Sequence, residues 1–229
     1  MVVFLPGLIC DATMFTPQVA FFSDSRAIDG YKNADSMEEM ARIVLDSAPE
    51  RFDLFGHSMG GRVALEVFRQ APERVRRFAI SSTGVHPRKE GETEKRHALR
   101  QVGYDHGFEA LVDQWLPPMI AEQNRAKPEI VHPLKEMCMA AGQDTFDAHV
   151  RALLGRPEVE SLLPQIMCPT LVMTGELDQW SPPAQLEAIA DQMPNAELVV
   201  VPGAGHMITR EAPEAVNAAI SDWLARPAD

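Results

Sequence analysis

Short runs of apolar and β-branched residues alternate along this chain with longer segments whose apolar residues recur every three or four positions. A strand buried in a parallel sheet reads as a continuous apolar run, whereas a helix that covers the sheet has a single apolar face. The pattern therefore predicts an α/β fold, a parallel sheet covered by helices. We expect strands at residues 2–5, 26–28, 52–55, 77–81, 170–174 and 198–201.

Three of the expected helices have recognisable ends. A helix over 37–47 follows Ser36, and Glu39 stands three residues later, which is the spacing of a capping box. A second helix is expected over 58–69, closed by an Ala-Pro pair. A third is expected over 213–224, where a proline occupies the first turn and its missing N–H is not needed. These helices complete the alternation with the strands.

The strand pattern disappears between residues 85 and 163, and helical patterns replace it. A helical insertion between two strands of a parallel sheet is best interpreted as a cap over the carboxyl edge of that sheet. The sequence thus predicts a core made of residues 1–84 and 164–229 and a helical cap at 85–163. Prolines are expected to break the helices of the cap at 117, 118, 128, 133 and 157.

The charge balance narrows the set of partners. Asp and Glu outnumber Lys and Arg by 33 to 21 in 229 residues, which gives a formal net charge of −12. A surface of this sign repels nucleic-acid phosphates and anionic lipid, and no run of basic residues offsets it locally. We expect neither a nucleic-acid partner nor a membrane partner, and a small molecule as the substrate. The sequence leaves the oligomeric state open.

The cysteine pattern and the first residues bear on the compartment. The three cysteines are scattered and form no Cys-x-x-Cys pair, so the sequence suggests neither a disulfide framework nor a zinc knuckle. The first five residues are apolar, but they lack a basic region and run directly into Pro6-Gly7, unlike a signal peptide. Since no apolar stretch is long enough to span a bilayer, we expect a soluble cytoplasmic protein.

A candidate nucleophile lies where an expected strand meets an expected helix, in Gly56-His57-Ser58-Met59-Gly60. A serine hydroxyl reacts only when it stands free of the sheet within reach of a base. The flanking glycines let the strand and the helix approach closely around a strained turn, and the start of the helix directs its amides toward the reaction. This context favours a nucleophilic Ser58 over a chance occurrence of the pattern.

Two later loops supply a carboxylate and an imidazole on the same edge of the predicted sheet. Asp178 follows the strand at 170–174, and His206 follows the strand at 198–201 in a loop rich in glycine. His206 is expected to be the base, and Asp178 the carboxylate that orients it. Glu176 is the rival carboxylate, but it comes one residue after Gly175 and has less chain with which to reach back.

The other histidines show no metal-binding pattern. His57 is expected to point away from Ser58, and none of the rest forms a His-x-x-x-His or a His-Glu pair. We therefore expect surface or packing roles for them and no metal site. The five that fall in the cap are His86, His97, His106, His132 and His149.

Acyl transfer also requires two amides directed at the developing oxyanion. The residue after the nucleophile commonly supplies one, so the Met59 N–H is the first expected donor. The Leu8 N–H is the second, because it follows the first strand and Gly7 lets the backbone approach closely.

Together, the three loops resemble the α/β-hydrolase superfamily over nearly the whole chain, and in particular its small bacterial esterase and enol-lactonase branch. The resemblance implies a helical cap, no cofactor, and attack of Ser58 on an ester or lactone carbonyl through an acyl-enzyme. The chain departs from many relatives in reading Pro6-Gly7 where they have His-Gly. It also starts without two preceding strands, which predicts a reduced, mostly parallel sheet of about six strands.

Apolar residues near these positions indicate a small, largely apolar substrate, with pocket residues at Phe15, Trp115, Trp180 and Met207. Two alternatives stay open. The segment 58–62 also resembles the menaquinone-pathway synthase of the superfamily, in which the triad abstracts a proton and eliminates pyruvate. Some plant hormone receptors of this fold bind a ligand under the cap, with the triad retained.

Overall fold

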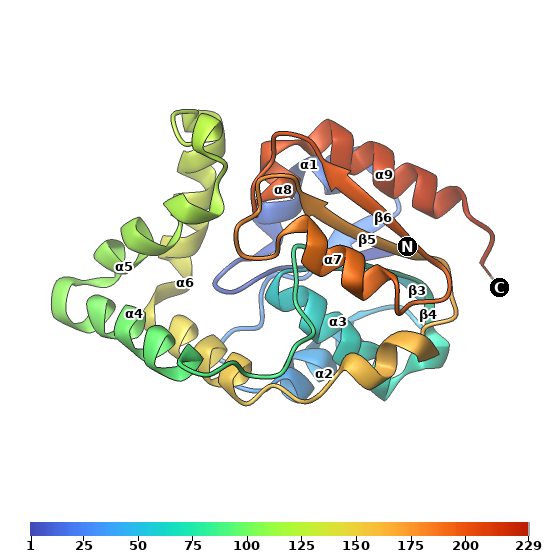
Figure 1. Ribbon diagram of the computed structural model, residues 1–229, viewed down its shortest axis with the longest axis horizontal. Helices are drawn as coiled ribbons and strands as arrows, with labels where there is room; N and C mark the ends of the chain where they lie inside the picture. The colour runs from blue at the N-terminus through green and yellow to red at the C-terminus, as the bar shows by residue number, and fades with distance from the viewer. Residues whose placement is uncertain (229) are drawn as a thin grey trace.

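The computed structural model describes residues 1–228, and its centre is a six-stranded sheet (Figure 1). The strands follow the order β2-β1-β3-β4-β5-β6, and every neighbouring pair is parallel. The predicted parallel sheet is confirmed. Its strands are β1 Val2–Leu5, β2 Ser25–Ala27, β3 Phe52–His57, β4 Val75–Ser81, β5 Thr170–Gly175 and β6 Ala196–Val201.

Helices cover both faces of the sheet. In Figure 1, α1, α8 and α9 lie above it, while α2 and α3 lie below it. Together with α7, the helices around the sheet are α1 Thr16–Phe21, α2 Met37–Ser47, α3 Met59–Gln70, α7 Pro183–Ala190, α8 Ile208–Glu211 and α9 Pro213–Ala225. Short 3₁₀ turns are η1 Ala12–Phe15, η2 Pro72–Arg74, η3 Pro117–Met119, η4 Glu122–Asn124 and η5 Glu160–Gln165.

Local signals account for the ends of the predicted helices. The Ser36 hydroxyl accepts the Glu39 N–H at 3.2 Å, which caps α2 as expected. Helix α3 starts at Met59, with Ser58 as its N-cap residue, and α9 carries its proline in the first turn. No helix in the part of the chain that the structure describes is both long enough and apolar enough to cross a membrane.

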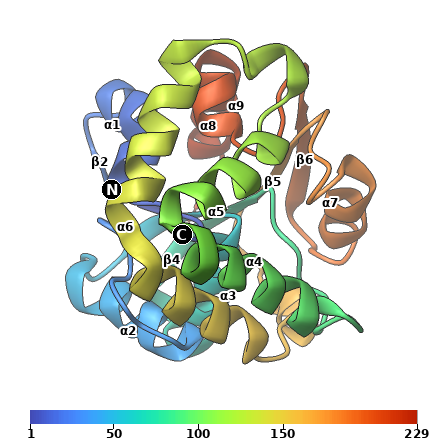
Figure 2. The ribbon, with the colours of Figure 1, turned by 90° about the vertical axis from the view of Figure 1, so that its left-hand side faces the viewer.

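Three helices lie between β4 and β5: α4 Glu92–His106, α5 Phe108–Trp115 and α6 Pro128–Leu154. In Figure 2 they cross in front of the sheet, on the side where its strands end. One detail differs from the sequence prediction, because Pro133 lies inside α6 and does not end it. The break comes instead at Gly142, whose φ of 77° and ψ of 172° are not helical.

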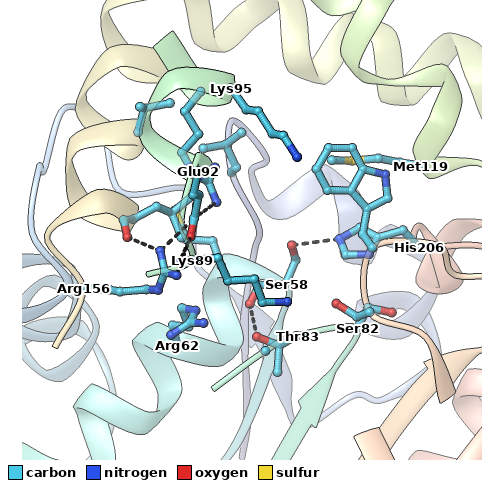
Figure 3. A pocket seen from close by; sticks show the side chains of 18 of the residues that line it. Ser58, Arg62, Ser82, Thr83, Lys89, Glu92, Lys95, Met119, Arg156 and His206 are labelled. Atoms are coloured by element: carbon cyan, nitrogen blue, oxygen red, sulfur yellow. Dashed lines mark hydrogen bonds and ion pairs between the residues drawn. The ribbon is translucent and has the colours of Figure 1, made fainter. Parts of the chain in front are cut away.

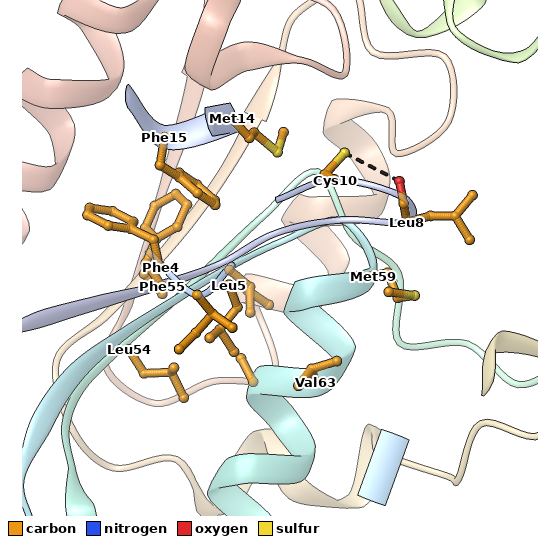
Figure 4. Packing of buried hydrophobic residues seen from close by; sticks show 14 of the residues in the cluster. Phe4, Leu5, Leu8, Cys10, Met14, Phe15, Leu54, Phe55, Met59 and Val63 are labelled. Carbon is orange, nitrogen blue, oxygen red and sulfur yellow. Dashed lines mark hydrogen bonds between the residues drawn. The ribbon is translucent and has the colours of Figure 1, made fainter. Parts of the chain in front are cut away.

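The hydrophobic core on one side of the sheet is built around three aromatic rings (Figure 4). Phe15 stacks on Phe4 at 5.0 Å between centroids and meets the edge of Phe55 at 6.1 Å. The prediction that Phe15 lines the substrate pocket is therefore wrong. Asp11 accepts the Thr13 N–H and caps the 3₁₀ turn η1, which directs the Phe15 ring toward the sheet, where it is fully buried.

Candidate active site

Ser58 occupies the turn between β3 and α3 in a strained backbone conformation. Its φ of 55° and ψ of −119° are values that residues with a side chain rarely adopt. The turn is tight because β1 passes beneath it, and a Cβ at Gly60 would lie 2.2 Å from the Leu5 carbonyl oxygen. Only glycine fits there. The turn holds the Ser58 hydroxyl clear of the sheet, as a nucleophile requires.

The structure brings the three residues singled out for a triad into one chain of hydrogen bonds. His206 Nε2 lies 2.9 Å from Ser58 Oγ, and His206 Nδ1 lies 2.9 Å from Asp178 Oδ2. The three residues follow β3, β5 and β6, whose carboxyl ends share one edge of the sheet. Asp178 and His206 are both buried, which shields their contact from water.

Asp178 is held as a carboxylate by its neighbours. Burial by itself would raise its pKa, but the charge and hydrogen bond of His206 keep the pKa well below the usual range of a carboxyl group. The N–H groups of Trp180 and Ser181 donate to Oδ1 at 2.8 and 2.9 Å and stabilise the same charge. An ionised Asp178 accepts the Nδ1–H of His206, which leaves Nε2 free to accept the Ser58 proton.

The rival carboxylate on this loop points elsewhere. Glu176 is exposed, and its Oε2 accepts the Gly203 N–H at 2.9 Å. It therefore orders the loop that carries His206 without contacting the imidazole.

The two amides expected to form an oxyanion hole lie beside Ser58. Neither the Leu8 N–H nor the Met59 N–H has an acceptor among the described residues, so both are available to a ligand. The first loop passes close to the nucleophile, because a Cβ on Gly7 would lie 3.2 Å from the Ser58 Cβ. This distance is tight enough to favour glycine at that position.

The shape of the oxyanion loop depends on a residue that sequence analysis placed among surface or packing histidines. His149, on α6, is almost fully buried, and its Nδ1 accepts the Ile9 N–H at 3.1 Å. Its Nε2 donates to the Lys32 carbonyl at 3.1 Å, and burial lowers its pKa to about 4. His149 is thus neutral and holds Ile9 at a φ of 48°. Since 140 residues separate the two partners, no local sequence signal could reveal this contact.

His57 bonds to the sheet and not to the nucleophile. Its Nδ1 lies 2.9 Å from Ser81 Oγ, and its ring lies 5.2 Å from the His206 ring. Burial, reinforced by the charge of His206, lowers its pKa well below the ordinary value. His57 therefore stays neutral and packs against the base.

A cavity of about 590 Å³ opens above Ser58 and His206, between the sheet edge and α4, α5 and α6 (Figure 3). Trp115 and Trp180 line it, together with Leu8 and Met59, and Met207 lines a small adjoining recess beside Ser58. The rest of the lining mixes apolar, neutral polar and charged side chains. Its basic members are Arg62, Lys89, Lys95, Arg96 and Arg156, and its acidic members are Glu90 and Glu92.

The described residues contain no group of three or more His, Cys, Asp or Glu side chains that could hold a metal ion. The residues brought together at this site supply an activated hydroxyl, an imidazole oriented by a carboxylate, and two free amides.

Comparisons with known proteins agree on one superfamily. A model of the alpha/beta hydrolase family matches residues 2–219. The chain is 25% identical to a pimeloyl-[acyl-carrier protein] methyl ester esterase of Nitrosomonas europaea, over 75% of this chain and 71% of that protein. It is also 28% identical to a thermophilic esterase of Thermogutta terrifontis, with a TM-score of 0.86 over 97% and 88% of the two chains. An enol-lactonase of Burkholderia xenovorans LB400, 22% identical, shares the fold with a TM-score of 0.86 over 98% and 91%.

Proposed function

Because the chain belongs to the alpha/beta hydrolase family, we propose that it is a serine hydrolase that cleaves a carboxylic ester or lactone of a small molecule. The observation that carries the proposal is the unbroken chain of hydrogen bonds from Ser58 through His206 to Asp178. Esterases among the similar proteins support the same reaction class.

Each group has a defined task in the proposed reaction. His206 Nε2 accepts the Ser58 proton while Oγ attacks the substrate carbonyl, and Asp178 stabilises the imidazolium that forms. The Leu8 and Met59 amides receive the negative oxygen of the tetrahedral intermediate.

Collapse of that intermediate breaks the bond to the alcohol oxygen, which takes the proton from His206. Water then gives a proton to His206 and attacks the acyl-serine. The acid leaves, and Ser58 regains its proton. With a lactone, the alcohol stays attached to the acyl group until water releases the open hydroxy acid.

Acylation of Ser58 is the direct test. Rapid mixing with 4-nitrophenyl acetate should give a burst of nitrophenol, and the intact protein should gain the mass of one acetyl group. Ser58→Ala should abolish both signals, and His206→Ala should lower turnover by several orders of magnitude. Circular dichroism should show that both variants are folded. Turnover at the wild-type rate in either folded variant would refute the proposal.

The menaquinone-pathway type of reaction is the second candidate, since Arg62 of the resembling segment 58–62 lines the cavity beside Ser58. In that reaction, the triad removes a proton from a carbon atom and no acyl-serine forms. Proton exchange or elimination without acetylation of Ser58 would favour this candidate. Ligand binding with no turnover of any ester would instead favour a receptor.

A further inference from the structure

The lining of the cavity is more basic than the protein as a whole. Five Lys and Arg side chains and two carboxylates line it, although the whole chain carries a formal net charge of −12. Figure 3 shows Arg62, Lys89, Lys95 and Arg156 around the same space as Ser58 and His206. A concentration of one charge sign in a cleft raises the local concentration of ligands of the opposite sign.

Two of these cations are already neutralised within the protein. Arg156 donates to both oxygens of Glu92 at 2.8 and 2.7 Å, and Arg96 donates to the same carboxylate at 2.9 Å. Burial would raise the pKa of Glu92, but these hydrogen bonds bring it to about 2, so the group is an anion at neutral pH. Arg156 and Arg96 are thus engaged in holding α4. Arg62, the two lysines and the Glu90 carboxylate remain, so the rest of the charged lining is still basic.

Arg62 is a buried cation without a carboxylate partner in the described structure. Only 6% of its surface is exposed, and its one hydrogen bond runs from Nη2 to the His86 carbonyl at 2.9 Å. Burial and the neighbouring Arg156 lower its pKa to about 9, so it is still protonated at neutral pH. The charges of Glu92 and Glu160 favour the cation, but neither carboxylate forms an ion pair with it. An anion bound in the cavity would supply the direct partner that this buried charge lacks.

Lys89 and Lys95 extend from the cap segment into the same space (Figure 3). Neither ammonium group forms an ion pair with any residue that the structure describes. Arg62 lies in the first turn of α3, four residues after Ser58, which corresponds to a rise of about 6 Å along the helix. An anionic group bound at Arg62 would therefore lie only a few bonds from a carbonyl held at Ser58.

We propose that the substrate carries a carboxylate, that Arg62 binds this carboxylate, and that Lys89 and Lys95 strengthen the binding from the cap side. Arg62 suits this task because its planar guanidinium can donate two parallel hydrogen bonds to a carboxylate. The inference rests on the proposed hydrolysis at Ser58, and it narrows the substrate to an acidic ester or lactone whose acyl part has the size of a short dicarboxylic acid.

Matched esters that differ only in charge test the proposal. The kcat/KM for monomethyl glutarate, which keeps a free carboxylate, should exceed that for dimethyl glutarate by at least about tenfold. Arg62→Gln should reduce this ratio by about 10- to 100-fold, the effect of losing a hydrogen bond to a charged group. Equal kcat/KM values for the two esters in the wild-type enzyme would overturn the proposal.

The lysines provide a second variant if Arg62→Gln does not fold. Replacing Lys89 and Lys95 together by Gln should lower the same ratio. Arg88→Gln is the matched control, because Arg88 is exposed, adjoins Lys89 and does not line the cavity. An unchanged ratio in the double variant, or an equal fall in the control, would contradict the role assigned to the lysines.

Binding of glutarate to the Ser58→Ala protein separates this inference from the proposed reaction. Titration calorimetry should detect binding of glutarate to the Ser58→Ala protein. Adding Arg62→Gln should weaken this binding by about 10- to 100-fold. If no acyl-enzyme forms at Ser58 but glutarate still binds, only the hydrolase assignment is overturned. Ser58-dependent cleavage of neutral esters without glutarate binding would overturn the carboxylate site alone.

Discussion

The loop after β5 carries two carboxylates, Glu176 and Asp178, only two residues apart, and either could be expected to orient His206. Asp178 is buried against His206, while Glu176 points outward to the backbone of Gly203. The two side chains therefore give a matched pair of variants.

Asp178→Asn should lower kcat by about 10⁴-fold, because an amide presents an N–H to His206 and stabilises the wrong tautomer. Glu176→Gln should change kcat only a few-fold, since the amide oxygen can still accept the Gly203 N–H. Steady-state kinetics on a simple aryl ester measures both. A larger loss in Glu176→Gln than in Asp178→Asn would reverse the assignment of the two carboxylates.

His149 joins α6 to the oxyanion loop as a neutral side chain. Its pKa is about 4 in the folded protein, against an ordinary value of 6.5. The unfolded state therefore binds more protons between these two pH values. The stability that His149 contributes is fully present above pH 6.5 and is lost as the pH falls toward 4, by about 3 kcal/mol at most.

Chemical denaturation at a series of pH values tests this behaviour of His149. His149→Asn keeps an acceptor for the Ile9 N–H but does not titrate. The variant should be less stable at pH 7, because it loses the bond to Lys32, and its free energy of unfolding should fall less between pH 6.5 and 4. An identical pH dependence in the variant would show that His149 is not the titrating group.

At the scale of elements, α6 changes direction at a single glycine. Gly142 combines a positive φ with an extended ψ, a region that is essentially restricted to glycine. A Cβ at this position would meet no other atom within 4 Å, so any penalty for a larger residue comes from the backbone. The chain keeps its helical pattern on both sides of the break.

Gly142→Ala should lower the free energy of unfolding by about 1–3 kcal/mol through this backbone strain. Gly155→Ala, at the end of the same helix, is the control, because Gly155 has a φ of −91° and its added Cβ would make an ordinary contact. Thermal or denaturant unfolding measures both. Equal stability of the two variants would argue against a kink held by Gly142.

For the whole molecule, Arg156 links the two ends of the inserted segment. It follows α6, where the chain returns toward the sheet, and it bonds to Glu92 at the start of α4 and to the His86 carbonyl. Only 2% of its side chain is exposed. Without Arg156, Glu92 would keep Arg96 as an ion-pair partner but would lose both hydrogen bonds from the buried guanidinium, a change that costs several kcal/mol.

Arg156→Met should therefore lower the free energy of unfolding by about 3 kcal/mol. Arg151→Met removes another arginine–carboxylate pair, with Asp35, but both partners are more than half exposed, so the expected loss is below about 1 kcal/mol. Denaturant unfolding of the two variants gives the comparison. Similar losses would mean that the Arg156 pair is as weak as an exposed one.

Much of this protein is determined by short stretches of sequence. The alternation of apolar runs and amphipathic segments predicted the parallel sheet and its helices. The burial of each strand or helix determines the pattern of apolar and polar residues within that same element. The nucleophile turn at Ser58 and the loops carrying Asp178 and His206 were also recognisable, since glycines must stand where chains approach closely.

Only the tertiary structure decided what surrounds those loops. Phe15 was placed in the pocket from its position in the chain, whereas the capped turn before it directs the ring into the core. The hydrogen-bond partners of His149 and Arg62 come from other segments of the chain, far away in sequence. The charge of the cavity could not be predicted either, because its cations come from α3, from α4 and the segment before it, and from the chain after α6. Short motifs specify local backbone geometry, but the lining of a cavity depends on how distant elements pack together.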